Sequence, residues 1–198
     1  MNKIKEIIIG TNNAGKYKEI CELLPKDVIK HSPKEFDLLN PEETGKTFKE
    51  NSLIKASYFS KKTNLICLAD DSGLEVELLN GAPGIYSARW GGKKNNFNIA
   101  IKKIYDEMKK NKKNWKNHRK ATFVCCLSIF WPDGKKYSRT GKIKGKISLK
   151  KKGNKGFGYD PIFIPNGYNQ TFGEMNSKLK MSIDHRFIAY KKIKKFFN

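Results

Sequence analysis

The first 25 residues contain the pattern that most restricts the fold of this chain. Ile4–Ile9 ends in three consecutive isoleucines before Gly10, which predicts a buried strand. Apolar residues at helical spacing follow over Gly15–Leu24, and Pro25 predicts the end of that helix. A buried strand, a tight loop and a helix in direct succession favour an α/β fold.

The same alternation continues along the chain. We expect further strands at Val28–His31, Leu65–Ala69, Leu74–Leu79 and Ile162–Ile164, a hairpin of Ala121–Trp131 with Lys135–Lys146, and helices over Thr47–Lys62, Phe97–Lys110 and Asp184–Phe197. The predicted fold class is α/β with a mixed β-sheet flanked by helices. A length of 198 residues fits a single domain over residues 1–198, which can have two lobes.

The charge of the chain raises the question of nucleic acid. Lys and Arg number 41 against 19 Asp and Glu, which gives a formal net charge of +22. Lysines are spread over the whole chain and often stand beside asparagines, as a coding bias would produce. The sequence has no zinc-finger, helix-turn-helix or aromatic RNA-binding motif. We therefore expect no dedicated nucleic-acid binding, although the charge can attract anionic nucleotides.

Apolar runs and cysteines indicate the compartment. The longest apolar runs are too short to cross a bilayer, and the N-terminus has no secretory signal pattern. The four cysteines form no CxxC pair and no zinc-binding spacing with histidine. We expect buried free thiols in a cytoplasmic protein that does not contact membranes.

The segment Gly10–Lys16 joins the first strand to the first helix with the spacing G-x4-G-K of a P-loop. Backbone N–H groups at a helix N-terminus bind phosphate, and Lys16 adds a full charge. A P-loop has Ser or Thr at the next position to hold Mg²⁺, whereas this chain has Tyr17. The segment thus indicates either a different phosphate-binding loop or an ordinary strand-to-helix turn.

Carboxylates for metal-assisted chemistry occur at three places. Asp70 and Asp71 follow the strand predicted at Leu65–Ala69, where α/β proteins place ligands, although a polar turn would also explain them. Glu42–Glu43 lies in the polar loop that precedes Thr47. Glu50 has a competing assignment as a capping-box residue.

Six blocks in order then resemble the inosine triphosphate pyrophosphatase family, whose members hydrolyse non-canonical purine nucleoside triphosphates. They are Thr11–Lys16 with Glu19, Thr47–Asn51 through Lys55-Ala56, Ala69–Leu74, Gly84–Trp90, Gly156–Pro161, and Lys180 to His185-Arg186. The resemblance implies Mg²⁺-dependent hydrolysis of ITP, dITP and XTP to the monophosphate and pyrophosphate by a cytoplasmic homodimer. It also implies an elongated sheet and two lobes with a central nucleotide cleft.

The resemblance also implies roles for individual residues. Thr11, Asn12, Asn13, Ala14, Gly15 and Lys16 should hold the triphosphate with Lys55 and Arg89, and Ser72 should contact the substrate. Asp71 should be both a metal ligand and the catalytic proton acceptor. Glu42 matches the second metal ligand best, with Glu43 and Glu50 as alternatives. Phe157, Gly158, Tyr159 and Asp160 should border the base, whose edge Lys180, His185 and Arg186 should reach.

Elementary chemistry agrees with a purine site of this kind. Hypoxanthine and xanthine carry an acceptor, O6, where adenine carries a donor amino group. A pocket of donors such as Lys180, His185 and Arg186 would therefore reject adenine. A P-loop-like NTPase or kinase remains the alternative, and the identity of the residue after Lys16 argues against it.

Overall fold

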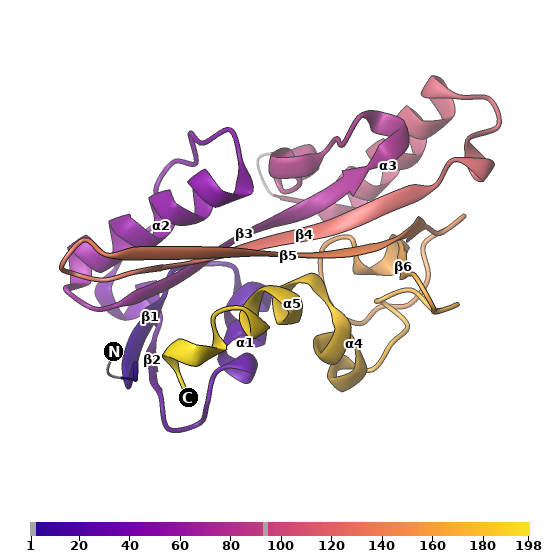
Figure 1. Cartoon of the computed structure of the whole chain (residues 1–198). Helices are drawn as coiled ribbons and strands as arrows, with labels where there is room; N and C mark the ends of the chain where they lie inside the picture. Colours follow the sequence, from indigo (N-terminus) through magenta and orange to yellow (C-terminus); the bar gives the residue numbers. More distant parts are fainter. Residues whose placement is uncertain (1–2, 93–94) are drawn as a thin grey trace. The chain divides into compact units, whose positions relative to one another are not determined.

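The computed structural model describes residues 3–92 and 95–198, which form a mixed α/β fold (Figure 1). Over these residues one sheet has six strands in the order β2-β1-β3-β4-β5-β6. The strands are β1 (Glu6–Ile9), β2 (Ile29–His31), β3 (Cys67–Val76), β4 (Lys120–Phe130), β5 (Lys136–Ile147) and β6 (Phe163–Pro165). The helices are α1 (Ala14–Leu23), α2 (Phe48–Thr63), α3 (Phe97–Asn111), α4 (Ser177–Ile183) and α5 (His185–Lys191). β2 and β3 run parallel to β1, and β6 runs antiparallel to β5, which confirms the predicted mixed sheet.

The chain divides into two compact units, and the three long strands contribute residues to both. The first unit comprises the residues up to Asp71 together with Cys125–Gly141 and Arg186–Asn198. The second comprises Ser72–Val124 and Lys142–His185. None of the helices in the described part of the chain is long and apolar enough to cross a membrane.

In the first unit the isoleucines of β1 alternate between two apolar clusters. Ile7 and Ile9 pack with α1, α5 and the end of the chain, whereas Ile8 packs with Ala56 and Phe59 of α2. Figure 1 shows α2 on one side of this part of the sheet and α1 and α5 on the other. A strand covered on both faces has a continuous apolar sequence, and each isoleucine stabilises the fold by roughly 1.5–3 kcal/mol.

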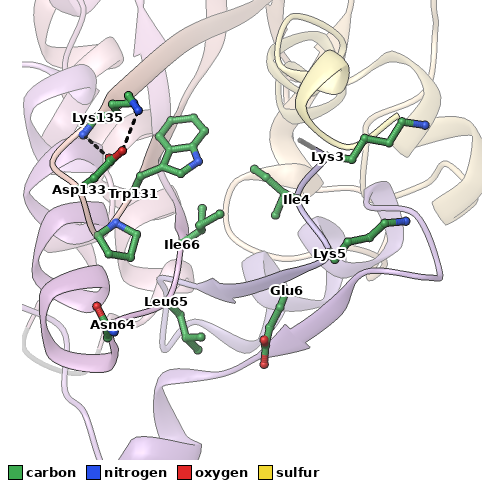
Figure 2. A pocket seen from close by; sticks show the side chains of 11 residues that line it. Lys3, Ile4, Lys5, Glu6, Asn64, Leu65, Ile66, Trp131, Asp133 and Lys135 are labelled. Carbon is green, nitrogen blue, oxygen red and sulfur yellow. Dashed lines mark hydrogen bonds and ion pairs between the residues drawn. The ribbon is translucent and has the colours of Figure 1, made fainter. Parts of the chain in front are cut away.

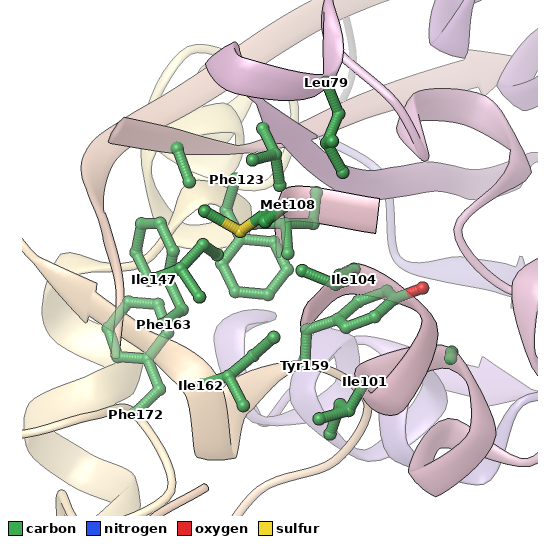
Figure 3. Close-up of a cluster of buried hydrophobic side chains, with 14 of the residues drawn as sticks. Leu79, Ile101, Ile104, Met108, Phe123, Ile147, Tyr159, Ile162, Phe163 and Phe172 are labelled. Carbon is green, nitrogen blue, oxygen red and sulfur yellow. The ribbon is translucent and has the colours of Figure 1, made fainter. Parts of the chain in front are cut away.

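The core of the second unit lies between its strands and α3 (Figure 3). Ala100, Ile101, Ile104 and Met108 form the buried stripe of α3. Aromatic rings from separate segments meet the same cluster, as in the edge contact of Phe123 with Phe163 at a centroid distance of 4.7 Å. This packing fixes the strands that lead to the candidate base-binding residues.

Two predicted boundaries are wrong. The strands expected at Leu65–Ala69 and Leu74–Leu79 are one strand, β3, so Asp70 and Asp71 lie inside a strand and not after one. Cationic side chains contact one oxygen of each of these buried acids, and the strand continues through them. The single helix expected over Asp184–Phe197 is also divided, because α5 ends at Lys191 and a separate 3-10 helix covers Lys194–Phe196. The structure adds α4 before it, which the sequence did not predict.

Candidate active site

The predicted phosphate loop lies between β1 and α1, in the first unit. Asn13 is the N-cap of α1, and its side chain accepts a hydrogen bond from the backbone N–H of Lys16 at 3.0 Å. The Thr11 hydroxyl accepts from the N–H of Asn13 at 3.2 Å. The first N–H groups of an α-helix have no partners within the helix. Ala14 and Gly15 are the first residues of α1, so their N–H groups are suited to donate to a phosphate.

Gly10 is required by packing. A Cβ on Gly10 would come within 2.8 Å of Cys67 Sγ and 2.9 Å of the Phe59 ring. The first glycine of the G-x4-G-K pattern is therefore explained by the close packing of β1 against β3 and α2. Tyr17 lies in the first turn of α1, and burial raises the pKa of its hydroxyl to about 12. Neither residue supports a standard P-loop metal site.

Asp70 and Asp71 are neighbours on β3, and their side chains meet different partners. Successive side chains on a strand point to opposite faces of the sheet. Asp70 contacts Lys16, which follows the phosphate loop, whereas Asp71 contacts Lys55 of α2. Both carboxylates are buried, with exposed fractions of 0% and 4%.

Lys55 links Asp71 to the loop that precedes α2. Its ammonium forms a short ion pair with Glu43 and lies 3.6 Å from Asp71 Oδ1. Burial lowers the pKa of this ammonium, but the charges of Asp71, Asp70 and Glu43 outweigh burial and raise the pKa overall. Burial raises the pKa of Asp71 to about 6, against the opposing charges of Lys16 and Lys55.

Asp70 contacts two cations through one oxygen. Its Oδ2 lies 3.3 Å from Lys16 Nζ and 3.1 Å from an Nη of Arg186. Arg186 also forms a short ion pair with Glu19 on α1. Arg186 is 1% exposed and contacts both of these carboxylates, and its predicted contact with the purine stays a prediction.

The loop between β2 and α2 is tied to the phosphate loop. Asn40 Oδ1 accepts a hydrogen bond from the N–H of Asn12 at 3.2 Å, and Asn12 Nδ2 donates to the carbonyl of Leu38 at 3.0 Å. The carboxylate of Glu50 accepts from the N–H of Lys46 at 2.6 Å, which assigns Glu50 to the start of α2. Glu42 is exposed, whereas its neighbour Glu43 is part-buried beside Lys55.

In the second unit a glycine-flanked loop forms around Asp160. Asp160 Oδ2 accepts a hydrogen bond from the N–H of Phe157 at 2.9 Å and one from Lys180 Nζ at 2.8 Å. A Cβ on Gly156, whose φ is 71°, would come within 2.0 Å of that oxygen. The ammonium of Lys180 also lies 5.1 Å from the centroid of the Phe157 ring.

The remaining predicted residues of the second unit have separate settings. His185 stacks on Phe123 at a centroid distance of 4.7 Å and an interplanar angle of 7°. The Tyr159 hydroxyl donates to the carbonyl of Ser87 at 2.8 Å, and burial raises its pKa. Ser72 is half-buried on β3. Arg89 is exposed beside the Tyr86 ring.

The described residues contain no group of three or more His, Cys, Asp or Glu side chains that could hold a metal ion. Asp71 and Glu43 nevertheless both reach the same ammonium, so their oxygens approach one region of space. Mg²⁺ is usually bound by one or two carboxylates together with substrate phosphates and water. A pair of carboxylates therefore suits a metal that arrives with a nucleotide.

A pocket of about 550 Å³ lies elsewhere in the first unit, and Figure 2 shows its lining. Its side chains come from the start of β1, the segment before β3 and the turn between β4 and β5. Two of its lysines already have carboxylate partners, Lys5 with Asp27 and Lys135 with Asp133. It contains none of the predicted site residues.

Sequence reasoning located most of these residues but missed several partners. Glu43 was considered only as an alternative to Glu42, and Glu19 was not assigned a role. The sequence carried a usable signal for Lys55, because this lysine lies on the same helical face as Phe48 and Phe59. A lysine on an apolar stripe predicts a buried ion pair.

Comparisons with known proteins agree over nearly the whole chain. The dITP/XTP pyrophosphatase of Bartonella quintana is 43% identical, over 94% of this chain and 93% of that protein. The dITP/XTP pyrophosphatase of Dictyoglomus thermophilum is 42% identical, over 97% and 94%. The structure of a HAM1 protein from Coxiella burnetii matches with a TM-score of 0.86 and 34% identity, over 97% of this chain and 98% of that chain.

The Staphylococcus aureus Ham1 structure matches with a TM-score of 0.82 and 36% identity, over 97% of each chain. The model of the Ham1 family matches residues 7–196. These findings confirm the family resemblance found in the sequence, and this chain belongs to the Ham1 family.

Proposed function

We propose that this protein is a nucleoside triphosphate pyrophosphatase that converts ITP, dITP and XTP to the monophosphate and pyrophosphate. The observation that carries the proposal is Asp71, a buried carboxylate with a pKa of about 6 that contacts Lys55. The names of the relatives support the substrate class, because they are dITP/XTP pyrophosphatases at about 40% identity. Such an enzyme removes deaminated purine nucleotides before they enter nucleic acid.

The first unit supplies the groups proposed for the triphosphate. The N–H groups that begin α1 and the ammonium of Lys16 would bind phosphate oxygens. Lys55 adds a second ammonium, and Arg89 of the second unit is a further phosphate contact in this proposal. Cations held in a water-poor site stabilise the charge that develops on departing pyrophosphate.

Asp71 is proposed as the proton acceptor for the attacking water. A general base works best when its pKa lies close to the working pH, and a pKa of about 6 leaves Asp71 ionised near neutrality. Lys55 would hold the carboxylate in place. Ser72, the next residue on β3, is the proposed substrate contact.

Mg²⁺ is proposed as the cofactor, and the residues present fit it. Asp71 and Glu43 provide two carboxylates that both contact the ammonium of Lys55. When bound, the metal would neutralise phosphate oxygens and polarise the α-phosphorus. Glu42, which the resemblance suggests as second ligand, is exposed, so we propose Glu43 in its place.

The second unit supplies the groups proposed for the purine. Phe157 offers an aromatic face, and stacking on such a face contributes about 1–3 kcal/mol without choosing a base. Lys180 and His185 are donors suited to the acceptor O6 of hypoxanthine and xanthine. The loop Phe157–Asp160 would border the base, and we propose that residues 1–198 form one functional domain.

One assay tests the proposal. The protein is incubated with ITP and Mg²⁺, and the products are separated by anion-exchange chromatography. We expect IMP and pyrophosphate, and Asp71→Asn should abolish turnover while the circular dichroism spectrum stays unchanged. IDP and orthophosphate would instead indicate the alternative NTPase activity. Full activity of Asp71→Asn would contradict the assignment of the proton acceptor.

The resemblance further supports a cytoplasmic homodimer. Four free cysteines are compatible with a reducing compartment, and three of them are buried. Homodimers are common among enzymes of this size. Light scattering on the purified protein measures the mass of the assembly directly, and a mass of one chain would contradict the dimer.

A further inference from the structure

We propose that Asp70 is a positioning residue that holds the ammonium of Lys16 in place for the triphosphate. Arg186 and Glu19 support it by fixing the first turns of α1 to β3. This inference rests on the proposed function, because it concerns how that site grips its substrate. It assigns Asp70 and Arg186 a role distinct from metal binding and from recognition of the purine.

Lys16 needs such a partner. A lysine side chain has four carbons between backbone and ammonium, and the loss of rotamer entropy opposes any single position. Asp70 Oδ2 lies 3.3 Å from the ammonium, and the Lys16 side chain is 17% exposed, so a ligand can still reach it. Ordering a binding group before the ligand arrives reduces the entropic cost of binding.

Asp70 can do this because it is itself immobile and charged. It is fully buried, and an isolated carboxylate there would cost several kcal/mol. Arg186 offsets that cost with an Nη at 3.1 Å from the same oxygen, and a guanidinium keeps its charge at any working pH. Asp70 thereby shares one charge between two cations, so it holds Lys16 without neutralising its attraction for phosphate.

Glu19 completes the arrangement from the helix that carries Lys16. The two residues are three positions apart on α1, and Glu19 forms the short ion pair with Arg186. The chain of contacts therefore runs from Lys16 to Asp70, then to Arg186, and back to α1 through Glu19. Two acids and two cations thus alternate along this chain of contacts. Asp71, on the opposite face of β3, is left for catalysis.

A double-mutant cycle tests the inference. The dissociation constant for inorganic tripolyphosphate is measured by calorimetry for the unchanged protein, Asp70→Asn, Lys16→Met and the double variant. We expect each single variant to bind about tenfold more weakly, which corresponds to about 1.4 kcal/mol. The double variant should bind no more weakly than Lys16→Met, because Asp70 acts through that ammonium. Lys18→Met, an exposed neighbour on α1, controls for general loss of charge.

The possible outcomes test the positioning role of Asp70 separately from the proposed pyrophosphatase activity. Additive losses, or an unchanged dissociation constant in Asp70→Asn, would overturn the positioning role, as would absence of tripolyphosphate binding to the unchanged protein. If circular dichroism shows that Asp70→Asn does not fold, the cycle is repeated with Glu19→Gln. We expect the effects of Glu19→Gln and Lys16→Met on binding to be coupled, and additive effects would overturn the positioning role of Asp70. Conversion of ITP to IMP and pyrophosphate by the unchanged protein is scored separately, so each proposal can fail alone.

Discussion

At the scale of single residues, this protein places several cations where apolar side chains usually lie. Lys55, Lys180 and Arg186 are each buried, and each contacts at least one carboxylate. Replacing such a pair with apolar residues often stabilises a protein, so these pairs are weak candidates for stabilising elements. Their positions make sense as fixed charges for an anionic substrate.

The neighbours Glu42 and Glu43 offer a matched test at this scale. We predict that Glu43→Gln lowers kcat/KM for ITP at least tenfold, because it removes the carboxylate that shares Lys55 with Asp71. Glu42→Gln should change kcat/KM less than twofold, since Glu42 is exposed. A tenfold loss corresponds to about 1.4 kcal/mol of transition-state stabilisation. Equal losses in the two variants, measured by pyrophosphate release, would contradict the preference for Glu43.

The sequence predicts some of these residues for identifiable physical reasons. Lys16 follows from loop spacing, whereas Lys55 was predicted only from the family resemblance. The choice between Glu42 and Glu43 does not follow, because a loop has no periodicity that would assign a direction to each side chain. The ion pairs of Arg186 with Asp70 and Glu19 were not predicted. They join segments more than 100 positions apart, and no local sequence pattern reveals such contacts.

At the scale of elements, β3 determines which acid does what. The expected break after Ala69 would have left Asp70 and Asp71 in one flexible turn. The continuous strand instead sends Asp70 towards Lys16 and Asp71 towards Lys55. The alternation of strand side chains would have predicted this division, had the acids been recognised as part of a strand. The strand was predicted to end before Asp70 and Asp71 because acids are unusual inside a buried strand. Their charged partners lie on segments distant in the sequence.

His31 connects β2 with β1 and with the 3-10 helix Pro33–Phe36, and these contacts predict how stability depends on pH. His31, on β2, lies 2.9 Å from Glu35 and 2.8 Å from Glu6 of β1. The hydrogen bond with Glu35, and then that with Glu6, raises the pKa of His31. A raised pKa means that the stabilisation is fully present below the unfolded value of about 6.5 and is lost as pH rises through the folded value.

We therefore expect His31→Gln to lower the thermal midpoint more at about pH 5.5 than at about pH 8.5. Differential scanning fluorimetry at both pH values measures the difference, and His118→Gln is the control for loss of an imidazole elsewhere. Glu35→Gln should lower the pKa of His31 in an NMR titration. A midpoint difference that grows with pH would have the wrong sign and would contradict the link.

At the scale of the whole molecule, the formal charge of +22 is the least specific feature of the chain and still has a physical consequence. A strongly positive surface attracts a triphosphate over distances of about a Debye length, roughly 10 Å at 0.1 M salt. Such attraction acts on the encounter and not on the chemical step. The positive charge can therefore affect nucleotide binding without any nucleic-acid partner.

We predict that kcat/KM for ITP falls several-fold as NaCl rises from about 50 to about 200 mM, whereas kcat stays within about twofold. Stopped assays over a salt series measure both constants. Potassium acetate at matched ionic strength controls for chloride that competes at the phosphate loop, because screening depends on ionic strength and competition depends on the anion. A flat kcat/KM would mean that the lysines are too dispersed to steer a nucleotide. A parallel fall in kcat would place the salt effect on the ion pairs around Asp70 and Asp71.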